Sequence, residues 1–350
     1  MRASLLLAVL AVAPLGGCST LAEAGGGDDD LPNARLGPFR ALEQTELGAA
    51  RVAPYAIRDD DDFPQDLGAL DVDGDPATPA VWGFAAVVEI AAGVDPDPAA
   101  ATNAIVRHVA EDGRSFARQR DVVLRPQEAW EGTRLGQPAP LAVEGEVWLY
   151  YAAEGGIGLA RSSDGKTFTR SDAEPVLSPS GGWEEGAVPA SPTVLQLPDG
   201  RFDMIYEVTV AGRALLGEAT SPDGLRFTRV GDGPLLEPEG ADAGGTASPC
   251  SLLATTAEGR VTQLLYYGAR DEDDQRAIAL AGRFDTRDPF TRATALVYGG
   301  SDGAWEPSVL RYRRFSLLFA TQPAGADDAP YPAVAAAIAP ATAHLGPPTP

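Results

Sequence analysis

The sequence is poor in the residues that build metal centres and covalent cross-links. Its 350 residues include only two histidines and two cysteines, Cys18 and Cys250. A structural zinc site draws its four ligands mostly from His and Cys, and a disulfide framework needs several cysteine pairs. Both kinds of structure are therefore excluded. The glycine-rich stretch at 155–158 has no helix after it, so it is not a dinucleotide loop, and no cofactor and no metal are predicted.

Positive charge is also scarce. The chain carries 27 Lys and Arg against 50 Asp and Glu, which gives a net charge of −23 at pH 7. A field of this sign repels a phosphate backbone, so nucleic acid is not expected as a partner. The charge does not identify a substrate, because solubility alone accounts for an acidic surface.

The longest apolar run lies at the N-terminus. Leu5–Leu15 follows Arg2 and is too short to span a bilayer as a helix, which gives it the layout of a secretory signal peptide. The run ends in Leu15-Gly16-Gly17-Cys18, which resembles a bacterial lipobox. That resemblance implies a signal peptide over residues 1–17 and lipidation at Cys18. The alternative is a plain signal peptide followed by a chance cysteine.

The residues after Cys18 extend this prediction. Ser19 stands where an aspartate would favour retention in the inner membrane, so the lipobox resemblance implies an anchor in the outer membrane of the cell envelope. Residues 18–37 include AEAGGGDDD and are predicted to form a flexible acidic tether. Residues 341–350 are predicted to be a proline-rich tail.

Glycine and proline, in contrast, are abundant, and they follow a repeat. The chain has 39 Gly and 30 Pro, a composition that suits many short strands joined by turns. One turn recurs every 50 to 60 residues or so, as AEDGRSFAR at 110–118, SSDGKTFTR at 162–170, SPDGLRFTR at 221–229 and DTRDPFTR at 285–292. Its Phe is expected to pack the repeats together, and its Arg to complete an ion pair that caps each repeat.

Each repeat also shows a common order of strands. Two β-rich runs meet at a hairpin-like turn, Pro198-Asp199-Gly200, a third run follows, and the Asp-Gly turn leads into a fourth. Four short antiparallel strands per repeat are typical of a propeller blade. The sequence therefore predicts an all-β, five-bladed β-propeller of four-stranded antiparallel blades over residues 38–340, with a strand from 38–58 completing the last blade. The inner strands are predicted to begin near Pro79, Pro140, Pro192, Pro249 and Pro307.

This pattern resembles the five-bladed propeller glycoside hydrolases, the relatives of arabinanases, β-xylosidases, levansucrases and invertases. The resemblance rests on WEEGAVPASPTV…MIYE followed by IGLARSSDGKTF…PVLSP, and it covers roughly residues 75–340. It implies carboxylates on acid-Pro steps where the inner strands enter a central funnel. One carboxylate would be the base or nucleophile, one the proton donor, and one would tune a pKa. Glycoside cleavage needs at least two of them.

The sequence departs from the family pattern at those steps. The residues before the five prolines are Thr78, Ala139, Ser191, Ser248 and Glu306. Only Glu306 is acidic, which makes it the first catalytic candidate.

Asp75, which precedes Pro76, is a candidate for a displaced base. It also ends DVDGD at 71–75, which has the alternating carboxylates of a calcium loop but lacks the acid at the twelfth position. A surface turn is the favoured interpretation of that stretch.

A Trp-acid step supplies the remaining candidates. Glu131, Glu184 and Glu306 follow Trp130, Trp183 and Trp305, and Asp242 takes the matching place in its repeat. In the functional interpretation Glu184 is catalytic, while Glu131, Asp242 and the three tryptophans bind substrate, the indoles stacking on sugar faces. In the structural interpretation each Trp is wedged between blades and each acid caps a loop.

Two functions follow from these observations. The first is a carbohydrate-active enzyme that hydrolyses glycosides by carboxylate acid-base chemistry. The second is a non-catalytic propeller that binds a glycan or a protein partner at the cell surface. Carbohydrate is the partner predicted first, and the lipid on Cys18 is the predicted link to the membrane.

Overall fold

The computed structural model describes residues 40–41, 64–71, 81–89, 102–110, 120–255, 260–293, 296–299, 303–312, 315–322 and 333–340. Within these ranges the chain consists of β-strands, turns and three single-turn 3₁₀ helices, η1 (Ala129–Glu131), η2 (Gly182–Glu184) and η3 (Gly240–Asp242). No helix in this part of the chain is long and apolar enough to cross a membrane. Cys18, Asp75 and the predicted tether and tail lie outside the described residues.

The strands form four-stranded antiparallel sheets, as the repeat predicts. Four sheets use consecutive strands: β2 (Pro64–Asp71), β3 (Val81–Glu89), β4 (Thr102–Ala110) and β5 (Arg120–Leu124); β6 (Leu135–Val143), β7 (Glu146–Ala153), β8 (Gly156–Ser162) and β9 (Thr169–Arg170); β10 (Ala190–Gln196), β11 (Phe202–Val210), β12 (Arg213–Ser221) and β13 (Thr228–Val230); β14 (Gly245–Thr255), β15 (Val261–Arg270), β16 (Arg276–Arg283) and β17 (Thr291–Arg292). A further sheet joins β18 (Trp305–Tyr312), β19 (Phe315–Gln322) and β20 (Ala333–Pro340) to β1 (Arg40–Ala41).

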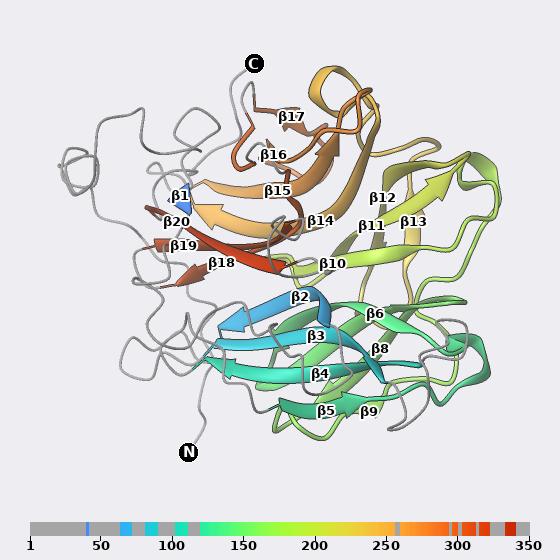
Figure 1. The fold of residues 1–350 in the computed structure, drawn as a ribbon. Coiled ribbons are helices and arrows are strands. Elements are labelled where there is room, and N and C mark those ends of the chain that lie inside the picture. The colour runs from blue at the N-terminus through green and yellow to red at the C-terminus, as the bar shows by residue number, and fades with distance from the viewer. Residues whose placement is uncertain are drawn as a thin grey trace, which may run out of the picture.

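The sheets surround a common centre in a propeller arrangement (Figure 1). The first strand of each sheet lies innermost, and these strands contact one another in the order β2, β6, β10, β14, β18, with β18 contacting β2. β1 lies within the segment predicted to complete the last sheet, and it pairs with β20. Hydrogen bonds between β1, from the early part of the chain, and β20, from its late part, therefore join the two in one sheet.

Two inner strands begin earlier than the sequence predicted, which corrects the positions given to Pro79 and Pro140. The segment after Pro79 is β3, the second strand of its sheet, and the inner strand is β2. In β6 the proline equivalent to Pro192 is Pro138. The error came from locating each inner strand by a proline: Leu67 stands at that place in β2, and β6 contains a second proline, Pro140, two residues beyond Pro138.

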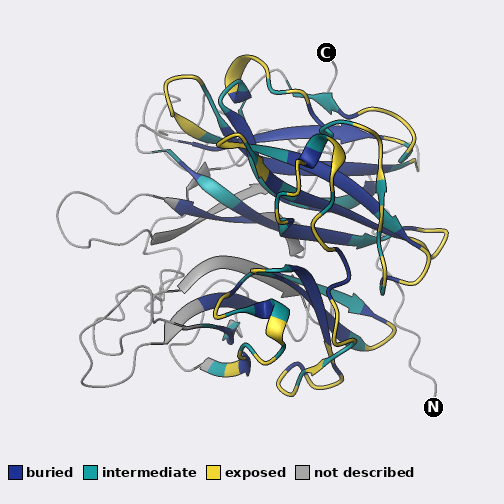
Figure 2. Cartoon of the chain, turned by 90° about the vertical axis from the view of Figure 1, so that its right-hand side faces the viewer, coloured by how far each residue is buried: buried dark blue, intermediate teal, exposed yellow. Residues whose placement is uncertain are grey.

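The hydrophobic core lies between neighbouring sheets. One cluster combines Val143, Trp148 and Tyr150 with Phe202 and Met204 of the next sheet. The rings of Trp148 and Phe202 stack with their centroids 5.4 Å apart. Figure 2 shows the buried residues running along the strands and the exposed ones gathered in the turns.

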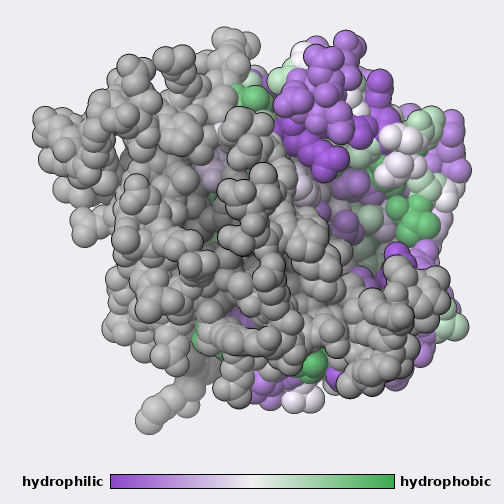
Figure 3. All heavy atoms as spheres, viewed as in Figure 1, coloured by the Kyte–Doolittle hydropathy of each residue, from purple (hydrophilic) through white to green (hydrophobic). Residues whose placement is uncertain are grey.

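The described surface seen in Figure 3 carries a group of hydrophilic residues near the loops of the β14–β17 sheet. Other charged side chains are buried within strands, among them Asp203, Glu218 and Arg283.

The repeated turn is a joint between sheets. In SPDGLRFTR, Ser221 Oγ accepts the N–H of Gly224 at 2.9 Å and Asp223 accepts the N–H of Leu225 at 2.9 Å, which closes the turn. Phe227 packs edge-on against Tyr150 of the preceding sheet, with ring centroids 5.9 Å apart. The predicted packing role of the repeated Phe is confirmed at this turn.

Gly224 makes this joint sensitive to a single methyl group. Its φ is +75°, and a Cβ there would lie 2.7 Å from Trp148 Cζ3 and 2.8 Å from the Tyr150 hydroxyl. Gly200 has a similar φ of +88°, but a Cβ there would meet nothing within 4 Å. The two glycines separate backbone strain from steric overlap.

We therefore expect Gly224→Ala to cost clearly more stability than Gly200→Ala. The control should lose about 1–2 kcal/mol for the left-handed backbone, and Gly224→Ala about 1–3 kcal/mol more for overpacking. Urea unfolding at constant m-value measures both. Equal losses would show that the turn does not press on the preceding sheet.

Candidate functional site

Every inner strand is interrupted by a bulge at the same place. The register with the second strand shifts between Gln65 and Gly68 in β2, and the same shift occurs in β6, β10, β14 and β18 at 136/139, 190/193, 247/250 and 305/308. A β-bulge inserts an extra residue and re-aims a side chain. In β6, β10, β14 and β18 the bulge brings one residue per strand to a pocket at the centre of the ring.

These re-aimed residues have a strained backbone. Gln137, Ser191, Ser248 and Glu306 have φ of +48°, +44°, +46° and +55°. Left-handed conformations in non-glycine residues cost about 1–3 kcal/mol each and persist only where the surroundings impose them. Four such residues at equivalent positions mark the centre of the ring as the candidate site.

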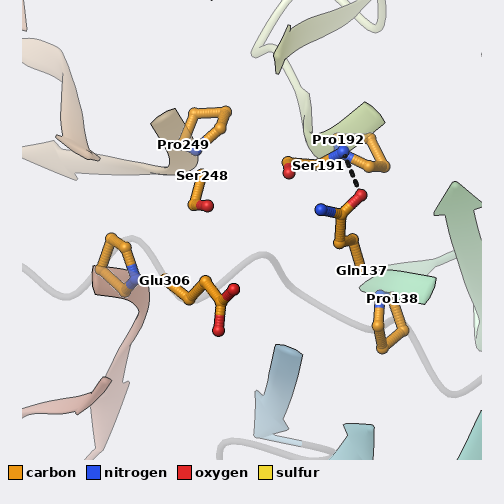
Figure 4. A pocket seen from close by; sticks show the side chains of 8 residues that line it. Gln137, Pro138, Ser191, Pro192, Ser248, Pro249 and Glu306 are labelled. Atoms are coloured by element: carbon orange, nitrogen blue, oxygen red, sulfur yellow. Dashed lines mark hydrogen bonds between the residues drawn. The ribbon is translucent and has the colours of Figure 1, made fainter. Parts of the chain in front are cut away.

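The four residues line one pocket, together with the proline that follows each of them: Pro138, Pro192, Pro249 and Pro307. In Figure 4 the Glu306 carboxylate reaches into the space between the strands, and the Gln137 amide turns towards Ser191. The N–H of Ser191 donates to Gln137 Oε1 at 2.9 Å. We call this the axial pocket, because inner strands of four sheets meet there.

β2 contributes an acid to the same ring of bulge positions. Asp66 occupies the register position that Gln137, Ser191, Ser248 and Glu306 hold in the other inner strands. Sequence reasoning missed it because Leu67, and not a proline, comes next. The bulge positions therefore include two acids, Asp66 and Glu306.

Glu306 is fixed by its own sheet. The Thr321 hydroxyl donates to Glu306 Oε2 at 2.6 Å, and Thr321 stands opposite Trp305 in the pairing of β18 with β19. One carboxylate oxygen is thus oriented by a neighbour, as a reacting carboxylate requires.

A second acid reaches this region from the strand behind. Glu207 of β11 accepts the Ser191 hydroxyl at 3.1 Å and the Ser248 N–H at 2.9 Å, so it touches two residues of the pocket lining. Burial raises the pKa of Glu207, and the nearby Glu306 charge raises it further, although the two hydrogen bonds act in the opposite direction. A comparison of the repeats could have found Glu207. It ends MIYE, whereas the equivalent residues of two other repeats are Ala152 and Gly268.

The other predicted acids lie elsewhere. Glu131, Glu184 and Asp242 end the three 3₁₀ helices and have only 0–2% of their surface exposed. Glu131 binds Arg170 Nε at 2.7 Å and accepts the Tyr151 hydroxyl at 2.6 Å. Burial opposes its ionisation, but the hydrogen bonds from Arg170 and Tyr151 outweigh that effect and lower the pKa of Glu131.

The same arrangement recurs in two more sheets. We call it a clamp: an acid at the end of a 3₁₀ helix that bonds an arginine and accepts a tyrosine hydroxyl. Glu184 pairs with Arg229 at 2.7 Å and accepts the Tyr206 hydroxyl. Asp242 pairs with Arg292 at 3.0 Å and accepts the Tyr267 hydroxyl at 2.8 Å. Each arginine is the last residue of the repeated turn, so the predicted capping ion pair is confirmed for these three copies, while Arg118 of the first copy lies outside the described residues. Each clamp ties the loop that enters a sheet to the outer strand of that sheet.

The tryptophans also lie apart from the axial pocket. Trp130 stacks on Tyr151 with centroids 6.2 Å apart, Trp183 packs against a core cluster, and Arg276 lies 4.9 Å above Trp305. None of the three lines the axial pocket. Trp305-Glu306 also differs from the other Trp-acid steps, because it lies within an inner strand and not in a 3₁₀ helix.

The fold is found in several solved structures, although no protein-family model and no curated protein matches the chain. A glycosyl hydrolase from Bacteroides ovatus is 16% identical over 91% of this chain and 99% of its own, with a TM-score of 0.61. The β-1,2-mannobiose phosphorylase from Listeria innocua, in complex with β-1,2-mannobiose, is 12% identical over 86% and 97%, with a TM-score of 0.62. The chain has the fold of these glycoside hydrolase-like propellers. At such identities the likeness concerns the fold alone.

The clamps predict unequal roles for two arginines of one turn. Arg229→Met should cost about 3 kcal/mol, because it leaves the buried Glu184 carboxylate unpaired, and adding Glu184→Gln should recover part of the loss. Arg226→Met is the matched control, since Arg226 pairs with Asp172 on the surface and should lose less than about 1 kcal/mol. Urea unfolding of the wild type, Arg229→Met, Arg226→Met and the double variant Arg229→Met/Glu184→Gln measures the free energies of unfolding. Similar losses for both arginines would contradict the clamp.

Proposed function

We propose that this chain is a carbohydrate-active enzyme that hydrolyses glycosidic bonds in the axial pocket. The observation that supports it most is the ring of bulges, which holds Glu306 and three polar residues in strained conformations around one pocket. The fold shared with glycoside hydrolases is in keeping with this. Glu306 keeps the catalytic role that the sequence predicted for it.

The bulge position of β18 supplies one of the acids that the chemistry needs. Glycoside hydrolysis uses two carboxylates flanking the scissile bond; Glu306 is the first of them, and the equivalent register position of the neighbouring inner strand, Asp66, is also an acid. Glu306 acts as base or nucleophile, with its Oε2 oriented by Thr321. Asp75 remains a proposed displaced base. We propose a structural role for Glu131, Glu184 and Asp242, since their carboxylates are already paired.

Water, and not phosphate, is the proposed acceptor. One solved neighbour is named a phosphorylase, and a phosphorylase must bind an anion. Phosphate sites are usually built from Arg, Lys or backbone N–H groups that converge. No basic side chain is among the described residues that line the axial pocket, and Glu306 would repel phosphate there. A net charge of −23 adds to that repulsion.

A non-catalytic binding propeller is the second candidate. Gln137, Ser191 and Ser248 hold three of the bulge positions, and neither an amide nor a hydroxyl replaces a carboxylate in acid-base chemistry. All three can hydrogen-bond sugar hydroxyl groups. In this case the axial pocket would bind a glycan at the cell surface without cleaving it.

We also propose that the ring has five blades, with β1 closing the last, and that a lipid on Cys18 anchors it to the outer membrane. The contact of β18 with β2 and the pairing of β1 with β20 support the closure. The lipobox-like sequence before Cys18 supports the anchor.

Product analysis tests the hydrolase. The full chain should release new reducing ends from at least one member of a panel of plant and microbial glycans, as detected by mass spectrometry. Glu306→Gln should lower the rate at least about 100-fold, whereas the exposed Glu174→Gln should not change it. Equal rates for Glu306→Gln and the wild type would move the chemistry away from the axial pocket. Glycan binding without products would favour the second candidate.

The anchor has its own test. In a Gram-negative host, Cys18→Ala should abolish incorporation of labelled palmitate and release the protein from the membrane fraction. Cys250→Ser should keep both, because Cys250 packs within the propeller, where its sulfur accepts the Val309 N–H. Label that persists in Cys18→Ala would contradict lipidation at that residue.

A further inference from the structure

The second strands carry one residue each that stands just behind the bulge. Ala86, Ala152, Glu207, Gly268 and Thr321 pair with the residue that precedes the bulge position in their sheets. Three of the five are Ala or Gly, so they leave room around the axis. Glu207 is the one acid of this layer.

Glu207 is held by two sheets at once. The Ser191 hydroxyl comes from its own sheet and the Ser248 N–H from the next, and both donate to Oε2. Among the described residues no donor is bonded to Oε1, and that atom is not one of the fully buried unpaired ones. The two donors therefore hold Oε2 against two residues that line the axial pocket, although Glu207 is not itself one of the lining residues.

The surroundings favour the protonated form of this carboxyl group. Burial is the main cause of the raised pKa of Glu207, and the charge of Glu306 adds to it. Within the described residues Glu207 forms no ion pair with a basic side chain, whereas Glu131 and Glu184 each pair with an arginine. An unpaired carboxyl beside another carboxylate is the common arrangement of an acid next to a base.

From this geometry we infer that Glu207 is the proton donor of the axial site, replacing an acid that the inner strand of its sheet lacks at Ser191. The inference rests on the proposed hydrolysis. Glu207 gives its proton to the glycosidic oxygen as the bond between that oxygen and the anomeric carbon breaks, and the bonding electrons stay on the oxygen. In the single-displacement form, a water oxygen bonds to the anomeric carbon and passes its proton to Glu306. Exchange with solvent then restores both carboxyl groups.

Leaving-group dependence tests this role. The full chain and Glu207→Gln are compared on the oligosaccharide that the panel identifies and on the 2,4-dinitrophenyl glycoside of the same sugar. The variant should lose about 10²–10⁴-fold in kcat/KM on the oligosaccharide. It should lose less than about 10-fold on the dinitrophenyl glycoside, whose leaving group departs without a proton. The fall in activity at high pH, caused by ionisation of the donor, should disappear in the variant.

The pH dependence of Ser191→Ala is a second test, because a purely structural role of Glu207 would leave the pH at which activity falls unchanged. Removing a donor to the carboxylate disfavours its ionised form, so the pKa of Glu207 rises and the fall in activity shifts to higher pH. Equal losses of Glu207→Gln on both substrates, with an unchanged pH profile, would overturn the role of Glu207 and leave the hydrolase standing. A wild type that cleaves nothing would overturn the hydrolase itself, and the role of Glu207 with it.

Discussion

The axial pocket depends on one backbone constraint, the bulge that turns a non-glycine residue into a left-handed conformation in four of the five inner strands, β6, β10, β14 and β18. Without it, the residues at 137, 191, 248 and 306 would follow the regular alternation of a strand and would not converge. Each such residue costs about 1–3 kcal/mol. The position of Glu306, the hydrogen bond from Thr321 and the access of Glu207 to Ser191 and Ser248 all follow from this constraint.

The remainder of the propeller supplies the stability that offsets the strain. Aromatic side chains pack between sheets, the Asp-Gly turns fit against the preceding sheet, and the buried clamps fix the loops that lead into the inner strands. The clamps use the acids that first suggested catalysis. Conspicuous repeated acids stabilise the frame, whereas the acids at the axial pocket differ from sheet to sheet.

This division explains what could be predicted from the sequence. The turn, its Phe and its Arg were predictable, because every repeat needs the same joint and repetition exposes it. Asp66 and Glu207 were missed because both depart from the repeat, and only the strand register places one at a bulge position and the other directly behind a bulge. The cluster of Asp203, Glu218 and Arg283 was equally hidden. Its hydrogen bonds, together with the one from Gln263 to Asp203, join two sheets through residues that are 60–80 positions apart in the sequence. Burial, followed by the charge of Glu218, raises the pKa of Asp203 there to about 7.

The central claim is that the carboxyl groups of Glu306, in the axial pocket, and of Glu207, directly behind it, flank one sugar. A crystal structure of the chain soaked with the monosaccharide product of its substrate tests this most directly. The account predicts the sugar in the axial pocket, with the carboxyl groups of Glu207 and Glu306 separated by roughly 5–10 Å, the range used by retaining and inverting glycosidases. A sugar bound elsewhere, or a separation well beyond that range, would contradict it.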